Sequence, residues 1–217
     1  MNLKNKTRAA GIAFGIAFFI FTIFAGLWIS FSDLGFYAAF REEKMDYAYI
    51  GKSPEEVERI TEDLIRYVQF GGEEKLAPHF NEREILHMID VRRLFVLSLI
   101  LMGAGAVTAL ATWIWGRKKE QFYKTAFRTL LLTIALAAAG GIAMVLSFDT
   151  AFVRFHELFF NNDLWLLDPR TDMMIRMLPQ ELFTRLFIRT LIIAALLNAG
   201  VLIRLNRLRR KTWNITE

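Results

Sequence analysis

The chain has 217 residues, of which 54% are hydrophobic and 20 are Phe, so it is far more apolar than a soluble domain of this size. Its formal net charge of +5 does not indicate nucleic-acid binding, because the basic residues cluster beside apolar runs. The absence of cysteine excludes disulfides and thiolate chemistry. Composition therefore indicates a membrane protein, and the four helical spans described next predict an all-α one.

Four long uncharged runs predict membrane-spanning helices. The first follows three basic residues, is too long for a signal-peptide core and has no small-residue cleavage site, which favours a retained helix. The fourth is short and is therefore extended back toward Leu182, with Arg185 and Arg189 snorkelling or facing protein. We predict spans at approximately residues 9–32, 94–116, 129–148 and 184–203.

The charges of the connecting segments predict the orientation. The N-terminus, the loop at 117–128 and the C-terminal tail are rich in Lys and Arg and contain only two acids, so they are predicted to be cytoplasmic. The other connections are richer in acids and are expected to face outward and pack together. The prediction is one four-helix transmembrane domain, residues 1–217, with a small helical extracytoplasmic cap from 33–93 and 149–183.

The first outer segment contains the start and stop signals of helices. Ser53 followed by Pro54 is an N-cap with proline at the first helical position, and a pair of glycines ends this helix. A second start lies at Asn81, where Glu84 completes a capping box. This second helix is predicted to run past His87 into the second span.

The outer segment before the last span combines a histidine with aromatic residues at helical spacing. If its first part is helical, His156 lies beside Phe152 and Phe160, because residues four positions apart are neighbours on a helix. Phe155 and Phe159 then fall near the same face as Phe152. An imidazole in this aromatic setting, close to a membrane span, makes His156 a candidate for chemistry.

His87 is the second histidine of interest. On the predicted helix Glu84 and Asp90 flank it, so a carboxylate can fix its tautomer and raise its basicity. One histidine at a membrane surface is more often merely a polar interface residue, but two on one side, each next to a span, make catalysis an equal alternative. His79, beside Pro78 in a turn, is interpreted as a surface residue.

Other chemistries have little support in the sequence. His156 and Glu157 begin like the zinc motif HExxH, but Phe160 stands in the place of the second ligand, so we expect no metal and no cofactor. There is no G-x-S-x-G elbow and no glycine-rich phosphate loop. The first three spans contain no acid or base for ion transport. Gly11 and Gly15 form a GxxxG pair, which fits either packing within the bundle or a dimer contact, and we expect a monomer.

Two separated motifs resemble those of the bacterial lipoprotein intramolecular transacylases. The upstream motif, similar to H-x-x-D-V, starts at His87 and includes Asp90. The downstream motif, similar to F-H-x-x-F-F…W-x-x-D-P-x-x-D-x-x-I…P, is formed by His156, Phe159, Phe160, Trp165, Asp168, Pro169, Asp172, Ile175 and Pro179. The resemblance extends to the whole chain, since members of this family are four-span proteins of this size with an extracytoplasmic cap.

The resemblance implies a reaction and a site. The sn-2 acyl chain of a diacylglyceryl-cysteine moves to the α-amino group of the same cysteine, which gives the lyso-form lipoprotein. The implied substrate is a diacylated bacterial lipoprotein in the cell membrane, and the implied catalytic pair is His87 and His156. Residues expected to orient these histidines or to line the cavity are Asp90, Phe152, Phe155, Phe159, Phe160, Trp165, Asp168 and Asp172. Arg154 and Arg170 are weaker candidates for contacting an oxyanion or a phospholipid headgroup.

The chemistry of such a transfer suits two histidines. Aminolysis of an ester needs a base for the amine proton, stabilisation of the oxyanion and an acid for the leaving oxygen. Two imidazoles can share these tasks near neutral pH, or one can act as a nucleophile and form an acyl-imidazole. Because donor and acceptor belong to one molecule, holding the headgroup folded supplies up to about 7–11 kcal/mol in favourable cases.

Two other functions remain open from the sequence. A phospholipid acyltransferase or hydrolase would transfer the acyl group between molecules or release a fatty acid. A non-enzymatic four-span scaffold would bind another protein through its cap, and alanine at both histidines would then leave its function intact.

Overall fold

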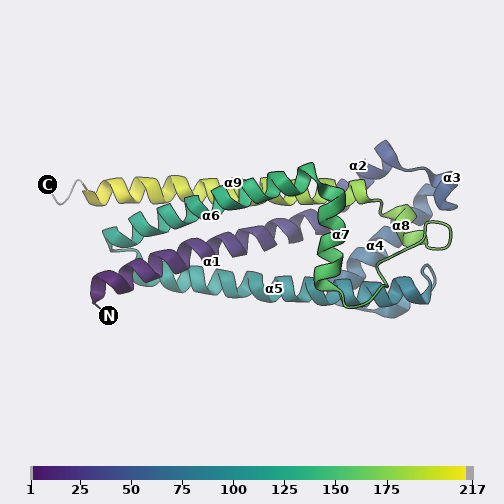
Figure 1. The fold of residues 1–217 in the computed structure, drawn as a ribbon, viewed down its shortest axis with the longest axis horizontal. Coiled ribbons are helices and arrows are strands. Elements are labelled where there is room, and N and C mark those ends of the chain that lie inside the picture. Colours follow the sequence, from purple (N-terminus) through teal and green to yellow (C-terminus); the bar gives the residue numbers. More distant parts are fainter. Residues whose placement is uncertain (1, 214–217) are drawn as a thin grey trace. The chain divides into compact units, whose positions relative to one another are not determined.

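The computed structural model describes residues 2–213, and this range contains helices and loops but no strand. The elements in chain order are α1 (Leu3–Ser32), α2 (Leu34–Lys44), α3 (Tyr47–Ile50), α4 (Pro54–Phe70), the 3₁₀ turn η1 (Glu73–Lys75), α5 (Glu82–Gly116), α6 (Glu120–Leu146), α7 (Phe148–Phe159), α8 (Met173–Met177) and α9 (Gln180–Trp213) (Figure 1). The prediction of an all-α protein is confirmed.

The chain divides into two compact units, which are described separately. The first unit comprises Met1–Trp28, Ser98–Leu146 and Ile188–Glu217. The second unit comprises Ile29–Leu97 and Ser147–Phe187.

Four helices, α1, α5, α6 and α9, are long and apolar enough to cross a membrane. Each contains one of the predicted spans, although α6 ends at Leu146, two residues before the predicted end, because the helix breaks at Ser147. With 35 residues, α5 is about 50 Å long, whereas the hydrocarbon core of a bilayer is about 30 Å thick. Part of α5 must therefore extend beyond the hydrocarbon core.

In the first unit, small residues allow the long helices to approach closely. A Cβ atom added at Gly11 of α1 would lie 2.8 Å from Cβ of Thr125 on α6, and one added at Gly15 would lie 2.8 Å from Cβ of Thr129. No side chain larger than hydrogen fits at either position without a shift of α6. The GxxxG pair therefore packs α1 against α6 within the bundle, which was one of the two interpretations of this motif.

One buried polar pair links α9 to α1 in the first unit. The side-chain amide of Asn198 donates to the hydroxyl of Thr22 and to the carbonyl of Ala194, both at 2.7 Å. Both side chains are buried. Such bonds between membrane helices contribute about 0.6 kcal/mol on average. This pair therefore fixes the register of α9 against α1 more than it stabilises the fold.

The second unit is built around α4, whose ends follow the predicted signals. The hydroxyl of Ser53 accepts from the backbone N–H of Glu56, and the Glu56 carboxylate accepts from the backbone N–H of Ser53. The helix ends at Phe70, where Gly71 and Gly72 adopt positive φ angles of 83° and 99°. The apolar face of α4 packs into one core with the start of α5 and with α8, a core that includes Val57, Ile60, Tyr67, Met88, Met173, Met174 and Met177.

Candidate active site

The two histidines of interest meet in the second unit. His87 lies near the start of α5 and His156 lies in the last turn of α7, which runs across the direction of α5 (Figure 1). Their ring centroids are 6.0 Å apart, and each residue is only 7% exposed. The fold therefore places side by side two imidazoles that are far apart in the sequence.

His156 sits among aromatic rings and makes one hydrogen bond. Its ring centroid lies 4.3 Å from that of Phe152, 5.4 Å from that of Phe160 and 5.0 Å from that of Trp165. Its Nδ1 lies 2.7 Å from the carbonyl oxygen of Phe152. A carbonyl oxygen only accepts, so Nδ1 carries the hydrogen and Nε2 carries the lone pair.

The surroundings of His156 also favour its neutral form. Burial lowers the pKa of His156 below the ordinary histidine value, although the hydrogen bond to the Phe152 carbonyl opposes this effect. At neutral pH the side chain is therefore an uncharged imidazole whose Nε2 is ready to accept a proton.

His87 differs from His156 because no residue that the structure describes fixes its tautomer. Its Nδ1 is buried and has no hydrogen-bond partner in the part of the chain that the structure describes. The ring packs edge-on against Phe160, with centroids 5.3 Å apart, so Phe160 contacts both imidazoles. A buried ring nitrogen without a partner is costly, and a substrate or a water molecule that bonded to it would remove that cost.

The acids that flank His87 in sequence bind elsewhere. Asp90 accepts hydrogen bonds from Arg93 at 2.7 Å and from the Asn162 amide at 2.8 Å. Glu84, only 1% exposed, accepts from the backbone N–H of Asn81 at 2.9 Å. Among the described residues neither acid is hydrogen-bonded to His87, so no carboxylate fixes its tautomer, although the charge of Asp90 acts to raise its pKa as expected, against the larger effect of burial.

Glu84 has a second partner, which the capping-box pattern did not suggest. Its other carboxylate oxygen accepts from the backbone N–H of Met174 at 2.6 Å, at the first turn of α8. One buried carboxylate thus binds the starts of two helices, α5 and α8. Through this contact Glu84 connects the turn before His87 to the segment that follows Trp165.

Asp168 and Asp172 shape the loop that carries Trp165. The carboxylate of Asp172 accepts from the backbone N–H of Asp168 at 2.7 Å and from the Asn81 amide at 2.9 Å. Hydrogen bonds from Arg170 lower the pKa of Asp168 to about 2, and this pair is exposed. Both acids therefore stabilise the loop by hydrogen bonds and do not reach the imidazoles.

One side of α7 presents apolar side chains to its surroundings. Phe155 is 43% exposed, Leu158 is 75% exposed and Phe159 is 47% exposed. The ring of Phe155 contacts His156, with centroids 5.5 Å apart, whereas the ring of Phe159 packs at a tilt against Phe155 and is not paired with either imidazole. The buried histidine is therefore flanked by an exposed apolar surface, which in soluble proteins marks a binding or membrane site.

Sequence reasoning missed Asn162 and the contact between Glu84 and Met174. Asn162 is an exposed loop residue whose only signal is its place in a polar turn before Trp165. Met174 contributes through its backbone, which leaves no side-chain signal. In the described part of the chain no group of three or more His, Asp or Glu side chains is arranged to hold a metal ion.

Comparison with known proteins identifies the family. The sequence profile described as lipoprotein intramolecular transacylase Lit matches residues 12–183, which include both histidines. The chain belongs to this family. It is therefore an acyltransferase, and the family reaction moves the sn-2 acyl chain of a diacylglyceryl-cysteine to the α-amino group of that cysteine.

Solved structures of the membrane integral lipoprotein intramolecular transacylase Lit from Bacillus cereus share the fold. One has 22% sequence identity and a TM-score of 0.84, and the match covers 97% of this chain and 99% of that chain. Two further structures of the same protein, with a histidine replaced by arginine or by alanine, give TM-scores of 0.75 and 0.70. Their identities are 22% and 24%, and each match covers 99% of this chain and 95% of that chain. No curated protein sequence matches the chain.

The family assignment decides between the functions that the sequence left open. An integral membrane transacylase of this family is an enzyme, so the scaffold alternative is not supported. The prediction of lipoprotein acyl transfer, made from the two motifs, is confirmed at the level of the family.

Proposed function

We propose that His156 and His87 carry out the intramolecular transfer as a base and an acid, with His156 as the base toward the amine. The observation that carries this assignment is the hydrogen bond from Nδ1 of His156 to the Phe152 carbonyl. It holds the ring in the tautomer whose Nε2 accepts a proton, and burial among aromatic rings keeps that ring neutral.

The proton then follows the acyl group. Nε2 of His156 removes a proton from the attacking α-amine as the new N–C bond forms at the sn-2 ester carbonyl. When the C–O bond of the ester breaks, His87 donates a proton to the departing glycerol oxygen. His156 returns the amine proton to His87, whose ring centroid lies 6.0 Å from its own. The amine proton thus ends on the glycerol oxygen, and both imidazoles return to their neutral state.

The exposed apolar side of α7 suits a diacylated lipoprotein. Phe155, Leu158 and Phe159 lie on the same short helix as His156 and are open to their surroundings. Acyl chains that contact these side chains would bring the ester toward the imidazoles while the polar headgroup remains near Asn162 and the Asp168 loop. The charges of the connecting segments support a site on the extracytoplasmic face of the cell membrane, with both termini in the cytoplasm.

Mass spectrometry of a lipopeptide tests the proposal. A diacylated N-terminal lipopeptide in detergent is incubated with the purified wild type, with His156→Ala, with His87→Ala and with His79→Ala as the matched control. We expect the wild type and the control to place an acyl group on the α-amine with unchanged total lipid mass, and both site variants to leave the substrate unmodified.

Other outcomes of this experiment would count against the assignment. Release of one acyl mass without N-acylation would show hydrolysis. An acyl group on the protein itself would show that a histidine is a nucleophile. Full activity of His156→Ala would show that His156 is not the general base.

A further inference from the structure

We propose that a groove in the first unit, between α1, α5 and α9, binds an acyl chain of an anionic phospholipid whose phosphate pairs with Arg204. The groove has a volume of about 380 Å³. It is lined by Phe14, Phe18, Phe21, Ala106, Ala109, Leu110, Trp113, Val201 and Arg204. Arg204 is the one charged residue of this lining, and none of these residues belongs to the proposed active site.

The order of the lining residues gives the groove a direction. In the first unit α1 and α5 run in opposite directions, and the rings of Phe14 and Trp113 are 5.7 Å apart (Figure 1). One end of the groove therefore holds Phe14 and Trp113, and the other end holds Phe21 and Ala106. The charged residue lies toward the first end, because Arg204 acts electrostatically on Tyr123, whose ring centroid is 6.0 Å from that of Trp113.

Arg204 is placed to receive an anion. It forms no hydrogen bond or ion pair with any residue that the structure describes, and it is exposed. From Leu182 to the end of α9 the sequence contains no acid, so α9 itself offers no partner. A guanidinium binds a phosphate by two parallel hydrogen bonds, and basic pockets between membrane helices are where acidic lipid headgroups bind.

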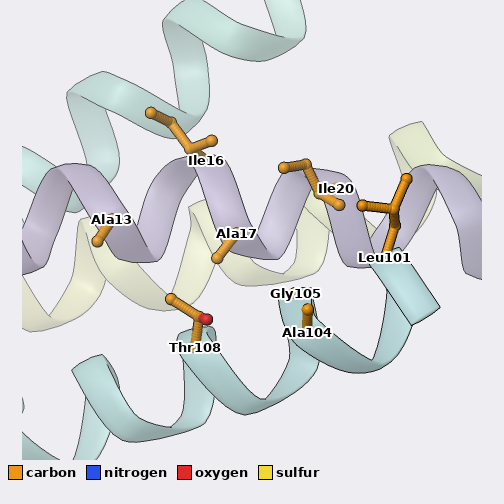
Figure 2. A pocket seen from close by; sticks show the side chains of 8 residues that line it. All are labelled: Ala13, Ile16, Ala17, Ile20, Leu101, Ala104, Gly105 and Thr108. Atoms are coloured by element: carbon orange, nitrogen blue, oxygen red, sulfur yellow. The ribbon is translucent and has the colours of Figure 1, made fainter.

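A second groove, which involves only α1 and α5, lacks the charged residue of the first one. It has a volume of about 310 Å³ and lies between α1 and α5, lined by Ala13, Ile16, Ala17, Ile20, Leu101, Ala104, Gly105 and Thr108 (Figure 2). This lining contains no charged and no aromatic residue. An acyl chain there would have no anchor for its headgroup, so it would exchange freely with bulk lipid. Arg204 and Trp113 distinguish the proposed lipid site from this ordinary lipid-facing surface.

Lipid binding to four variants tests the proposal. Purified protein is titrated with phosphatidylglycerol or phosphatidylcholine in detergent, and bound lipid is counted by native mass spectrometry. Arg204→Gln removes the phosphate partner, and Ala106→Phe fills the groove. The matched controls are Arg210→Gln, an exposed basic residue outside the lining, and Ala104→Phe, which fills the second groove.

We expect the wild type to bind phosphatidylglycerol about tenfold more tightly than phosphatidylcholine, which corresponds to one new ion pair of about 1.4 kcal/mol. Arg204→Gln should lose this preference, and Ala106→Phe should lose tight binding of both lipids. Both control variants should bind like the wild type. If Ala106→Phe does not fold, Ala106→Leu replaces it.

Three results would overturn the proposal. The first is unchanged preference for phosphatidylglycerol in Arg204→Gln. The second is equal loss in Arg210→Gln, which would show a general effect of positive charge. The third is binding of inorganic phosphate or glycerol phosphate that depends on Arg204 and is as tight as that of the lipid, which would show that the groove contributes nothing.

Discussion

The two units of this enzyme bury polar groups in different ways. In the first unit the buried polar side chains are neutral, such as Thr22 and Asn198, and helix packing depends on small residues. In the second unit the buried groups include the carboxylates of Glu84 and Asp172, each of which accepts several hydrogen bonds. The buried imidazoles of the second unit differ from these acids, because each keeps a ring nitrogen that forms no hydrogen bond with the residues the structure describes; three buried oxygens, of Ser30, Thr190 and Asn198, share this lack of a partner.

This contrast indicates where the function lies. A buried carboxylate is stable only when its oxygens accept hydrogen bonds, and in the second unit both Glu84 and Asp172 do so. The same unit leaves Nδ1 of His87 buried without a partner, at a cost of about 1–3 kcal/mol. Unlike the Ser30 hydroxyl, which also lacks a partner, this nitrogen lies beside a second imidazole, so we propose that the substrate bonds to it.

The largest expected effect is on the reaction rate of His156→Phe, a variant that removes the base but keeps a ring of similar size. In His156→Phe a ring still fills the space between Phe152 and Trp165, but the base is absent. We expect the acyl-transfer rate to fall by about 10²–10⁴-fold. The midpoint of thermal unfolding should change little, which differential scanning fluorimetry can check. A large drop in that midpoint would mean that the imidazole is structural.

The next effect concerns the Glu84 carboxylate, which accepts hydrogen bonds at the starts of both α5 and α8. In Glu84→Ala the backbone N–H of Met174, which is buried, and that of Asn81, an exposed residue, both lose their acceptor. The loss at the buried N–H should destabilise this unit by about 1–3 kcal/mol, and the loss at the exposed one by about 0.5–1.5 kcal/mol. Hydrogen exchange should show faster exchange in α8 than in α6. The control is Glu82→Ala, an exposed position two residues earlier, and equal exchange in both variants would contradict the role of the cap.

A smaller effect is expected in the first unit from one methyl group. In Gly15→Ala the new Cβ would lie 2.8 Å from Cβ of Thr129, so α1 and α6 must move apart, at a cost of about 1–3 kcal/mol. Gly103 has open space around its Cβ position, so Gly103→Ala should be neutral or slightly stabilising. Thermal unfolding of the two variants in detergent measures the difference. Equal stabilities would show that the glycine contact does not hold the helices together.

The features that sequence reasoning predicted are local. The capping boxes at Ser53 and Asn81 involve residues three positions apart, and the contacts of His156 with Phe152 and Phe160 follow from helical spacing. The four spans follow from the absence of charge. The pairing of His87 with His156 needed the resemblance to a family, because no local pattern connects two distant segments.

The features that were missed are long-range or belong to the backbone. Asp90 was expected at His87 because the two are one helical turn apart, but the Asn162 loop offered it an amide donor. The tautomer of His156 depends on a main-chain carbonyl of its own helix, which residue types do not encode. Sequence spacing gives the candidates for a contact, and the fold decides among them.

The smallest expected effect is in the pH dependence. Below about pH 7.7 the substrate α-amine becomes protonated, which alone lowers the rate tenfold per pH unit. If His156 had an ordinary histidine pKa of about 6.5, its protonation would make the fall steeper, about 100-fold per unit, below that pH. Because burial lowers the pKa of His156, the base stays neutral further into acid. The slope of log kcat/KM against pH should therefore stay near one just below about pH 6.5 and steepen only at lower pH. A slope near two directly below about pH 6.5 would show that the aromatic surroundings do not keep this imidazole uncharged.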